Sequence, residues 1–307
     1  MGGGILRALQ ACGYDNLVYR TIEELDLTDQ AQTRAFFAQE NPEVVIIAAA
    51  RVGGIMANWE YPYEFVQENL AIELNVIHEA YRSGVKRLIF LGSSCIYPRA
   101  APQPLKEEYL LTGPLEETNR PYAIAKIAGI ELCRGLNREH GTNYLSLMPT
   151  NMYGPGDNFN LETSHLVPAL VRKFHEGKVA GTPVILWGTG TPRRELMHVD
   201  DLAAAACLFL EGGNWSNVPD ALINIGTGRD CTIAELAETV RRVVGYDGEI
   251  IWDGSKPDGT PQKLLDVSRA RALGWEARIG LEDGLRRTYG WYCERCGGTA
   301  PEGERHT

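Results

Sequence analysis

The feature that most constrains this sequence is an alternation between helical stretches and short apolar, often β-branched runs, from residue 5 to about residue 150. The runs at 44–49 and 87–91 are apolar on both faces of the pleat, as strands covered by helices on both sides must be. Between them, residues 63–83 carry apolar side chains at helical spacing, and Gly84 follows as a helix stop. The sequence therefore predicts an α/β fold with a doubly wound parallel sheet.

The pattern changes after residue 150. A segment rich in Gly, Pro and Asn is followed by an expected helix from about 164 to 177, and then by short strands and turns. Further amphipathic helices are expected at 231–244 and 281–291. We therefore expect three parts, which are a sheet part at 1–150, a smaller α/β lobe at 151–292 interleaved with the last strands of the sheet, and a tail at 293–307.

Charge and hydropathy exclude several classes of partner. The 40 acidic residues outnumber the 30 basic ones, and the net charge of −10 argues against a nucleic acid or an anionic membrane surface as the main partner. No apolar run approaches the roughly 18 residues of a membrane span. Because no signal-peptide pattern opens the chain, a cytoplasmic protein is expected.

The cysteines and one acidic cluster are interpreted without a metal. The seven cysteines are scattered and odd in number, which is typical of a reducing compartment. Cys293 and Cys296 form a C-x-x-C pair with no second pair to complete a zinc site, so they are interpreted as part of a frayed terminus. The sequence His-Val-Asp-Asp at 198–201 is interpreted as the capped start of a helix at 202–210.

Two polar motifs lie where such a sheet binds ligands. Tyr122 and Lys126 are four residues apart, so on a helix both side chains emerge on one face. The positive charge of the lysine is expected to lower the pKa of the phenol from about 10. Directly after the run 87–91, the sequence Gly-Ser-Ser-Cys at 92–95 places hydroxyls and a thiol at the carboxyl end of a strand. Open α/β sheets bind their ligands at that edge.

A serine at a strand exit, followed by Tyr-x-x-x-Lys on the next long helix, resembles the short-chain dehydrogenase/reductase superfamily and its Rossmann-type fold. Six segments narrow this resemblance to the GDP-L-fucose synthase family. They are AAARVGGI at 48–55, LGSSCIYP at 91–98, PYAIAKIAG at 121–129, MPTN at 148–151, YGP at 153–155 and KPDGTP at 256–261. The resemblance covers residues 2 to about 292.

The resemblance implies an NADPH-dependent enzyme that makes GDP-L-fucose from GDP-4-keto-6-deoxy-D-mannose by 3,5-epimerisation and 4-keto reduction. Tyr122 matches the proton donor, Lys126 the lysine that binds the cofactor ribose and tunes the tyrosine, and Ser93 the serine at the sugar C4 oxygen. Cys95 and His165 match the acid/base pair of the epimerisation. A thiol and an imidazole, with ordinary pKa values of about 8.5 and 6.5, suit proton exchange near neutral pH.

The resemblance also implies binding residues and an assembly. The residues for NADP are Gly2, Arg20, Leu91, Gly92, Ser93, Ser94, Lys126, Pro149, Thr150, Asn151, Met152 and His165. The residues for the GDP-sugar are Lys173, Trp187, Arg194 and Asp258. Arg20 favours NADP because a basic residue there can pair with an adenosine 2′-phosphate, although two glutamates lie nearby. A homodimer through helices that include residues 120–140 is expected.

The chain departs from the family at its start. The family begins with a strand that leads into G-x-x-G-x-x-G, whose glycines let the cofactor pyrophosphate approach a helix N-terminus. Gly2 aligns with the third glycine, so the first strand and two glycines, about a dozen residues, do not appear here. That strand is central in the order 3-2-1-4-5-6, and strands at 17–19 and 44–49 would lie beside a gap. We therefore hypothesise an upstream start or a poorly active fragment.

Two alternative functions follow. The first is a remnant that binds the sugar nucleotide but cannot hold the cofactor. The second is a related epimerase or reductase that acts on another 4-keto sugar nucleotide. Dehydration is not expected, because the related dehydratases place an Asp-Glu pair where this chain has Ser94 and Cys95.

Overall fold

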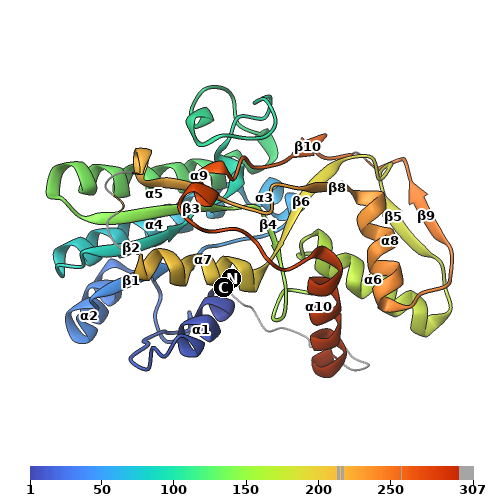
Figure 1. The fold of residues 1–307 in the computed structure, drawn as a ribbon, viewed down its shortest axis with the longest axis horizontal. Coiled ribbons are helices and arrows are strands. Elements are labelled where there is room, and N and C mark those ends of the chain that lie inside the picture. The colour runs from blue at the N-terminus through green and yellow to red at the C-terminus, as the bar shows by residue number, and fades with distance from the viewer. Residues whose placement is uncertain (213–214, 216–217, 257, 297–307) are drawn as a thin grey trace.

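The computed structural model describes residues 1–212, 215, 218–256 and 258–296 (Figure 1). Its main sheet has four parallel strands in the order β1-β2-β3-β7. These strands span Val44–Ile47, Arg87–Leu91, Asn143–Pro149 and Leu222–Ile225. The predicted parallel α/β sheet is confirmed.

Helices cover both faces of this sheet (Figure 1). On one face lie α2 (Gln30–Glu40), α4 (Pro62–Arg82) and α5 (Arg120–His140), and on the other lie α1 (Gly2–Ala11) and α7 (Val199–Glu211). In β2, Leu88 and Phe90 belong to the first core, which lies between the sheet and α2, α4 and α5. Ile89 and Leu91 belong to the second core, which lies between the sheet and α1 and α7. Burial on both faces explains why this strand is apolar at successive positions.

The edge of the main sheet differs from expectation. Among the described strands, β1 pairs with β2 alone. The expectation of a strand at 17–19 is wrong, because residues 15–21 are irregular. Val18 and Tyr19 are 49% and 63% exposed. A strand needs a neighbour to accept and donate its backbone hydrogen bonds. No described strand pairs with this segment.

The second lobe is built from smaller sheets. In the first, β4 (Asn151–Tyr153), β6 (Arg193–His198) and β10 (Gln262–Lys263) are parallel, and β8 (Asp230–Thr232) runs antiparallel to β6. In the other, β5 (Val184–Trp187) pairs with β9 (Ile250–Asp253). These sheets pack with α6 (Leu166–Ala180), α8 (Ile233–Val244) and α10 (Leu281–Cys296) around a third core.

Short helices complete the chain. They are α3 (Ile55–Glu60), α9 (Ser268–Ala272) and the 3-10 turns η1 (Ser94–Ile96), η2 (Glu107–Tyr109), η3 (Glu117–Asn119) and η4 (Pro219–Ala221). Within the ranges given above, no helix is long and apolar enough to cross a membrane.

Two local interpretations have different outcomes. His198 caps α7, since its Nδ1 accepts the Asp200 backbone N–H at 3.3 Å, so the structural interpretation of 198–201 is confirmed, although the helix begins at Val199. The predicted start of the tail at residue 293 is too early, because α10 continues to Cys296. Tyr292, which is 4% exposed, holds this last turn in the third core. The remaining residues of the predicted tail, 297–307, lie outside the described residues.

Candidate active site

The carboxyl end of β2 carries two of the predicted site residues. Gly92 permits a close approach to β3, because a Cβ at this position would overlap the Met148 side chain. Ser93 then caps η1, and its Oγ accepts a hydrogen bond from the Cys95 backbone N–H at 3.2 Å. This turn therefore presents a hydroxyl and a thiol at the ligand-binding edge of the sheet.

Helix α5 brings Tyr122 and Lys126 to the same edge. A hydrogen bond joins the Ser93 and Tyr122 side chains, and Lys126 Nζ lies 5.7 Å from the centre of the Tyr122 ring. Lys126 is buried, and its Nζ donates to the Leu91 carbonyl oxygen at 3.1 Å. The same nitrogen lies 3.1 Å from Glu73 Oε1 of α4. Ser93, Tyr122 and Lys126 thus form one connected group.

The expected lowering of the Tyr122 pKa is wrong for this arrangement. Burial raises the pKa of Tyr122 well above its usual value, and the nearby Cys95 and Glu73 raise it further, while the hydrogen bond with Ser93 lowers it. The physical reason is that burial disfavours the charged form of the phenol, and that Glu73, 3.1 Å from Lys126 Nζ, offsets the positive charge expected to lower the pKa. Tyr122 is therefore protonated at neutral pH, the state that a proton donor needs.

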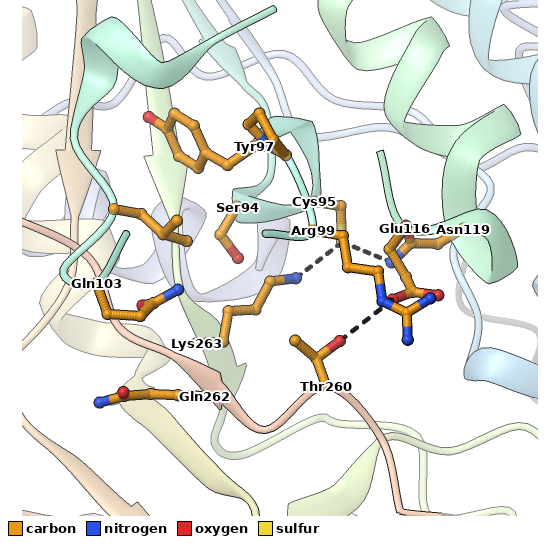
Figure 2. Close-up of a pocket in the computed structure, with 12 residues that line it drawn as sticks. Ser94, Cys95, Tyr97, Arg99, Gln103, Glu116, Asn119, Thr260, Gln262 and Lys263 are labelled. Atoms are coloured by element: carbon orange, nitrogen blue, oxygen red, sulfur yellow. Dashed lines mark hydrogen bonds and ion pairs between the residues drawn. The ribbon is translucent and has the colours of Figure 1, made fainter. Parts of the chain in front are cut away.

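Cys95 lies in a small pocket at this edge (Figure 2). Asn119 of η3 and Lys263 of β10 approach its Sγ, with Nδ2 at 3.3 Å and Nζ at 3.4 Å. Both groups are donors, so they hold the sulfur in position, and the ammonium is a second proton carrier beside the thiol. Neither residue is among those predicted from the sequence. The signal that could have found them is their place two residues from the quoted motifs at 121–129 and 256–261.

His165, the predicted partner of Cys95, is exposed at the N-cap of α6. The segment before it lies near the start of α3, since a Cβ on Gly54 would lie 3.4 Å from the Ser164 carbonyl oxygen. In the described part of the chain, no hydrogen bond joins His165 to Cys95. The acid/base pairing of these two residues stays a prediction.

Glycines open α1 next to the end of β1. A Cβ on Gly2 would lie 3.5 Å from the Cβ of Ala48, and one on Gly4 would lie 2.8 Å from a methyl carbon of Val199. Glycine at position 4 therefore lets α1 pack closely on α7. The first backbone N–H groups of a helix have no acceptor within it, so this end suits an anionic group such as a pyrophosphate.

Arg20, the residue predicted to select NADP, lies before α2. Its Nη2 is 2.7 Å from Glu40 Oε1, and its guanidinium lies 5.5 Å from the centre of the Phe36 ring. The side chain is thus positioned by a carboxylate and a ring. Its contact with a 2′-phosphate stays a prediction.

The predicted cofactor segment 149–152 joins the two lobes. Pro149 ends β3, and Met152 lies in the middle of β4. Between them, Thr150 Oγ1 and Asn151 Nδ2 both donate to the Glu195 carbonyl oxygen, at 3.2 and 2.8 Å. These bonds tie the end of the main sheet to β6.

The predicted sugar-nucleotide residues gather on the second lobe. Trp187 is 60% exposed, and Lys173 Nζ lies 5.8 Å from the centre of its ring. Lys256, which is not among the predicted binding residues, places its Nζ 5.6 Å from the same ring. An exposed aromatic face between two ammonium groups suits a stacked base that is attached to phosphates.

Arg194 and Asp258 lie beside this group. Arg194 Nη1 donates to the Thr260 carbonyl oxygen at 2.6 Å, and Asp258 accepts from the backbone N–H and hydroxyl of Thr189 at 3.0 and 2.7 Å. Burial lowers the pKa of Arg194, and the nearby Asp258 opposes this shift. A Cβ on Gly188, the residue after Trp187, would overlap the Asp258 carboxylate, so the two predicted residues are close.

The fold and this site define a class of protein. The family model described as "NAD dependent epimerase/dehydratase family" matches residues 5–226. The chain belongs to this family.

Within it, the chain is similar to GDP-L-fucose synthases. It is 56% identical to GDP-L-fucose synthase 1 of Arabidopsis thaliana, with 95% of this chain and 90% of the relative covered. It is 53% identical to GDP-L-fucose synthase of Escherichia coli (strain K12), with 96% and 94% covered. A solved GDP-mannoheptose C4 reductase from Campylobacter jejuni with NADP bound has a TM-score of 0.87 and 38% identity over 95% of this chain and 94% of its own. The predicted resemblance and the prediction of an epimerase/reductase enzyme are confirmed.

Proposed function

We propose that the protein converts GDP-4-keto-6-deoxy-D-mannose to GDP-L-fucose by epimerisation at C3 and C5 and NADPH-dependent reduction at C4. One observation carries this proposal. A single sheet edge holds the Ser93, Tyr122 and Lys126 group, which suits carbonyl reduction, and the Cys95 thiol with its donors, which suits proton exchange. The similarity to two GDP-L-fucose synthases above 50% identity supports the choice of substrate.

The residues along this edge fit NADP. The glycines at 2–4 leave room for a pyrophosphate at the start of α1, Arg20 supplies a cation for a 2′-phosphate, and buried Lys126 supplies a donor for a ribose hydroxyl. The Campylobacter reductase, which is similar over 95% of this chain, has NADP bound. When bound, NADPH supplies the hydride that reduces C4.

Epimerisation uses the acidity that the C4 ketone gives to the C–H bonds at C3 and C5. Inversion needs one group to remove a proton and another to deliver one to the opposite face. We assign these roles to Cys95 and His165. The hydroxyls of Ser93 and Tyr122 donate hydrogen bonds to the enolate oxygen, as an oxyanion hole does.

Reduction uses Tyr122 as the proton donor. The raised pKa of its hydroxyl keeps the proton in place until the C4 alkoxide, a stronger base, forms beside it. Ser93, whose side chain is hydrogen-bonded to Tyr122, binds the same C4 oxygen. The product is a C4 alcohol, and the tyrosine is reprotonated from solvent.

The second lobe holds the nucleotide in this proposal. Trp187 stacks on the guanine base, and Lys173 and Arg194 bind the diphosphate. Lys173 gives charge without the bidentate geometry of an arginine. Burial lowers the pKa of Lys173, and an anionic diphosphate beside it would oppose that shift.

We also propose a cytoplasmic homodimer that forms through α4 and α5. The two helices lie side by side on one face of the sheet (Figure 1). They expose large apolar side chains, with Tyr63 72%, Leu74 50% and Ile124 45% exposed. Self-association would bury these groups. The cysteines whose side chains are described are free thiols, which suits a reducing compartment.

The test is NADPH oxidation with GDP-4-keto-6-deoxy-D-mannose in heavy water, with analysis of the product. The proposal expects GDP-L-fucose that carries deuterium at C3 and C5. Reduction without deuterium at these carbons would favour a reductase for another 4-keto sugar nucleotide. Binding of the sugar nucleotide with no NADPH oxidation would favour the cofactor-deficient remnant.

A further inference from the structure

A buried carboxylate lies under the reduction site, on a helix that contributes no residue to the reaction as proposed above. Glu73 belongs to α4 and is 1% exposed. Its Oε1 lies 3.1 Å from Nζ of Lys126, which is 2% exposed. An acidic residue among the apolar positions of a buried helix face is costly to bury, so a specific partner is expected.

The surroundings of Lys126 make this carboxylate important. Its ammonium lies 4.8 Å from the centre of the Phe90 ring and 5.7 Å from that of Tyr122, and it donates to the Leu91 carbonyl oxygen. Rings and a carbonyl orient the ammonium but do not neutralise it. Glu73 is the group at ion-pair distance that does.

The packing of α5 on α4 is adapted to this carboxylate. At Gly129, one turn after Lys126, a Cβ would lie 2.9 Å from Glu73 Oε2 and 2.5 Å from Phe90 Cζ. Glycine in a helix interior costs stability, so a packing reason is expected. Here the missing side chain makes room for Glu73 and Phe90.

The charge of Glu73 also acts on the proton donor. It raises the pKa of Tyr122, in the same direction as burial. The pKa of Glu73 itself is raised by burial and lowered by Lys126. Among the described residues, two further titratable groups lie near this cluster. Cys133 on α5 has a pKa that is raised by burial and by Glu73, and Cys95 after β2 raises the pKa of Tyr122.

We propose that Glu73 is a positioning residue for the reduction step, whose buried carboxylate fixes the Lys126 ammonium under the Tyr122 ring and keeps the Tyr122 hydroxyl protonated for donation to C4. This inference rests on the proposed function. It deepens that function, because Glu73 acts through Lys126 and Tyr122 and does not touch the sugar. Epimerisation depends on it less, because Cys95 and His165 exchange the protons and Tyr122 only donates a hydrogen bond to the enolate oxygen.

The test is the pH profile of NADPH-dependent reduction by Glu73→Gln. Removing the negative charge lowers the pKa of Tyr122, so the phenol ionises at lower pH and the alkaline fall of the rate moves to lower pH, by about one unit. With Lys126 less well held, kcat falls about 10- to 100-fold. The KM for NADPH rises, while the KM for the sugar nucleotide and deuterium uptake at C3 and C5 stay near wild type.

Glu79→Gln is the matched control. Glu79 is also a buried glutamate of α4, 3% exposed, but it pairs with Arg34 at 3.0 Å, away from the site. We expect this variant to lose stability without a shift of the profile. A Glu73→Gln variant whose kcat and KM for NADPH change no more than those of Glu79→Gln would overturn the proposal.

A second variant covers the case in which Glu73→Gln does not fold. Glu73→Asp keeps the charge but withdraws it from Lys126, so kcat should fall while the alkaline limb stays in place. An unchanged kcat in Glu73→Asp would then overturn the proposal. Absence of reduction by the wild-type protein would instead count against the proposed function itself.

Discussion

Among single residues, Cys95 and Tyr122 separate the two halves of the proposed reaction. Cys95→Ser keeps a small polar group between Asn119 and Lys263 but removes the acidic thiol. Deuterium uptake at C3 and C5 should fall at least about 100-fold, the usual scale of acid/base catalysis. Reduction of an already epimerised 4-keto sugar should stay near wild type. Cys12→Ser, at an exposed thiol, is the control, and equal losses in both variants would contradict the assignment.

Tyr122→Phe should have the opposite effect. It keeps the ring beside Lys126 and removes the proton, so reduction should fall by about 10²- to 10⁴-fold. Deuterium uptake loses one of two hydrogen bonds to the enolate oxygen and should fall less. Labelled 4-keto sugars should then accumulate, which mass spectrometry measures. The control is Tyr144→Phe, which removes a buried hydroxyl bonded to the Val85 carbonyl oxygen and should cost stability of about 1 kcal/mol only. Reduction that survives in Tyr122→Phe would exclude this tyrosine as the donor.

At the level of elements, α4 and α5 do two things at once. Their inner faces form the core with β2 and carry the Glu73 and Lys126 pair, and their outer faces expose apolar side chains. In a symmetric dimer each substitution on the outer face occurs twice. We expect Leu74→Glu to shift the protein from dimer to monomer, as light scattering would show, because it brings carboxylates to an apolar interface.

The control for this prediction is Val179→Glu. Val179 is 75% exposed on α6, away from α4 and α5, so its substitution should leave the dimer intact. A wild-type protein that is monomeric at all concentrations would contradict the proposed assembly. So would a Leu74→Glu variant that stays dimeric.

For the whole molecule, the prediction concerns the cofactor. NADP at about 100 times its Kd should stabilise the fold by about 2.7 kcal/mol, seen as a rise in Tm of several degrees. Arg20→Met should lose most of the preference for NADP over NAD and keep the stabilisation by NAD. Equal stabilisation of the wild type by both cofactors would contradict the role of Arg20. No stabilisation by either would favour the remnant.

Much of the molecule follows from local patterns. The βαβ unit at 44–91 and the helices near 164, 231 and 281 form close to their predicted positions. Two expectations about ends are wrong for tertiary reasons. The apolar residues at 17–19 have no neighbouring strand, and the chain beyond Trp291 continues as a helix because Tyr292 is buried in the third core.

By itself the sequence determined what is local: which runs are strands and helices, the one-turn spacing of Tyr122 and Lys126, and the hydroxyls and thiol at a strand exit. The tertiary structure decided what these groups touch. Lys263 reaches Cys95 from 168 residues away, and Glu73 reaches Lys126 from another helix. Parallel strands bring their carboxyl ends to one edge of the sheet whatever their separation in the chain, so these partners follow from the topology. The raised pKa of Tyr122 follows from its burial. The spacing of residues along the sequence carries neither kind of information.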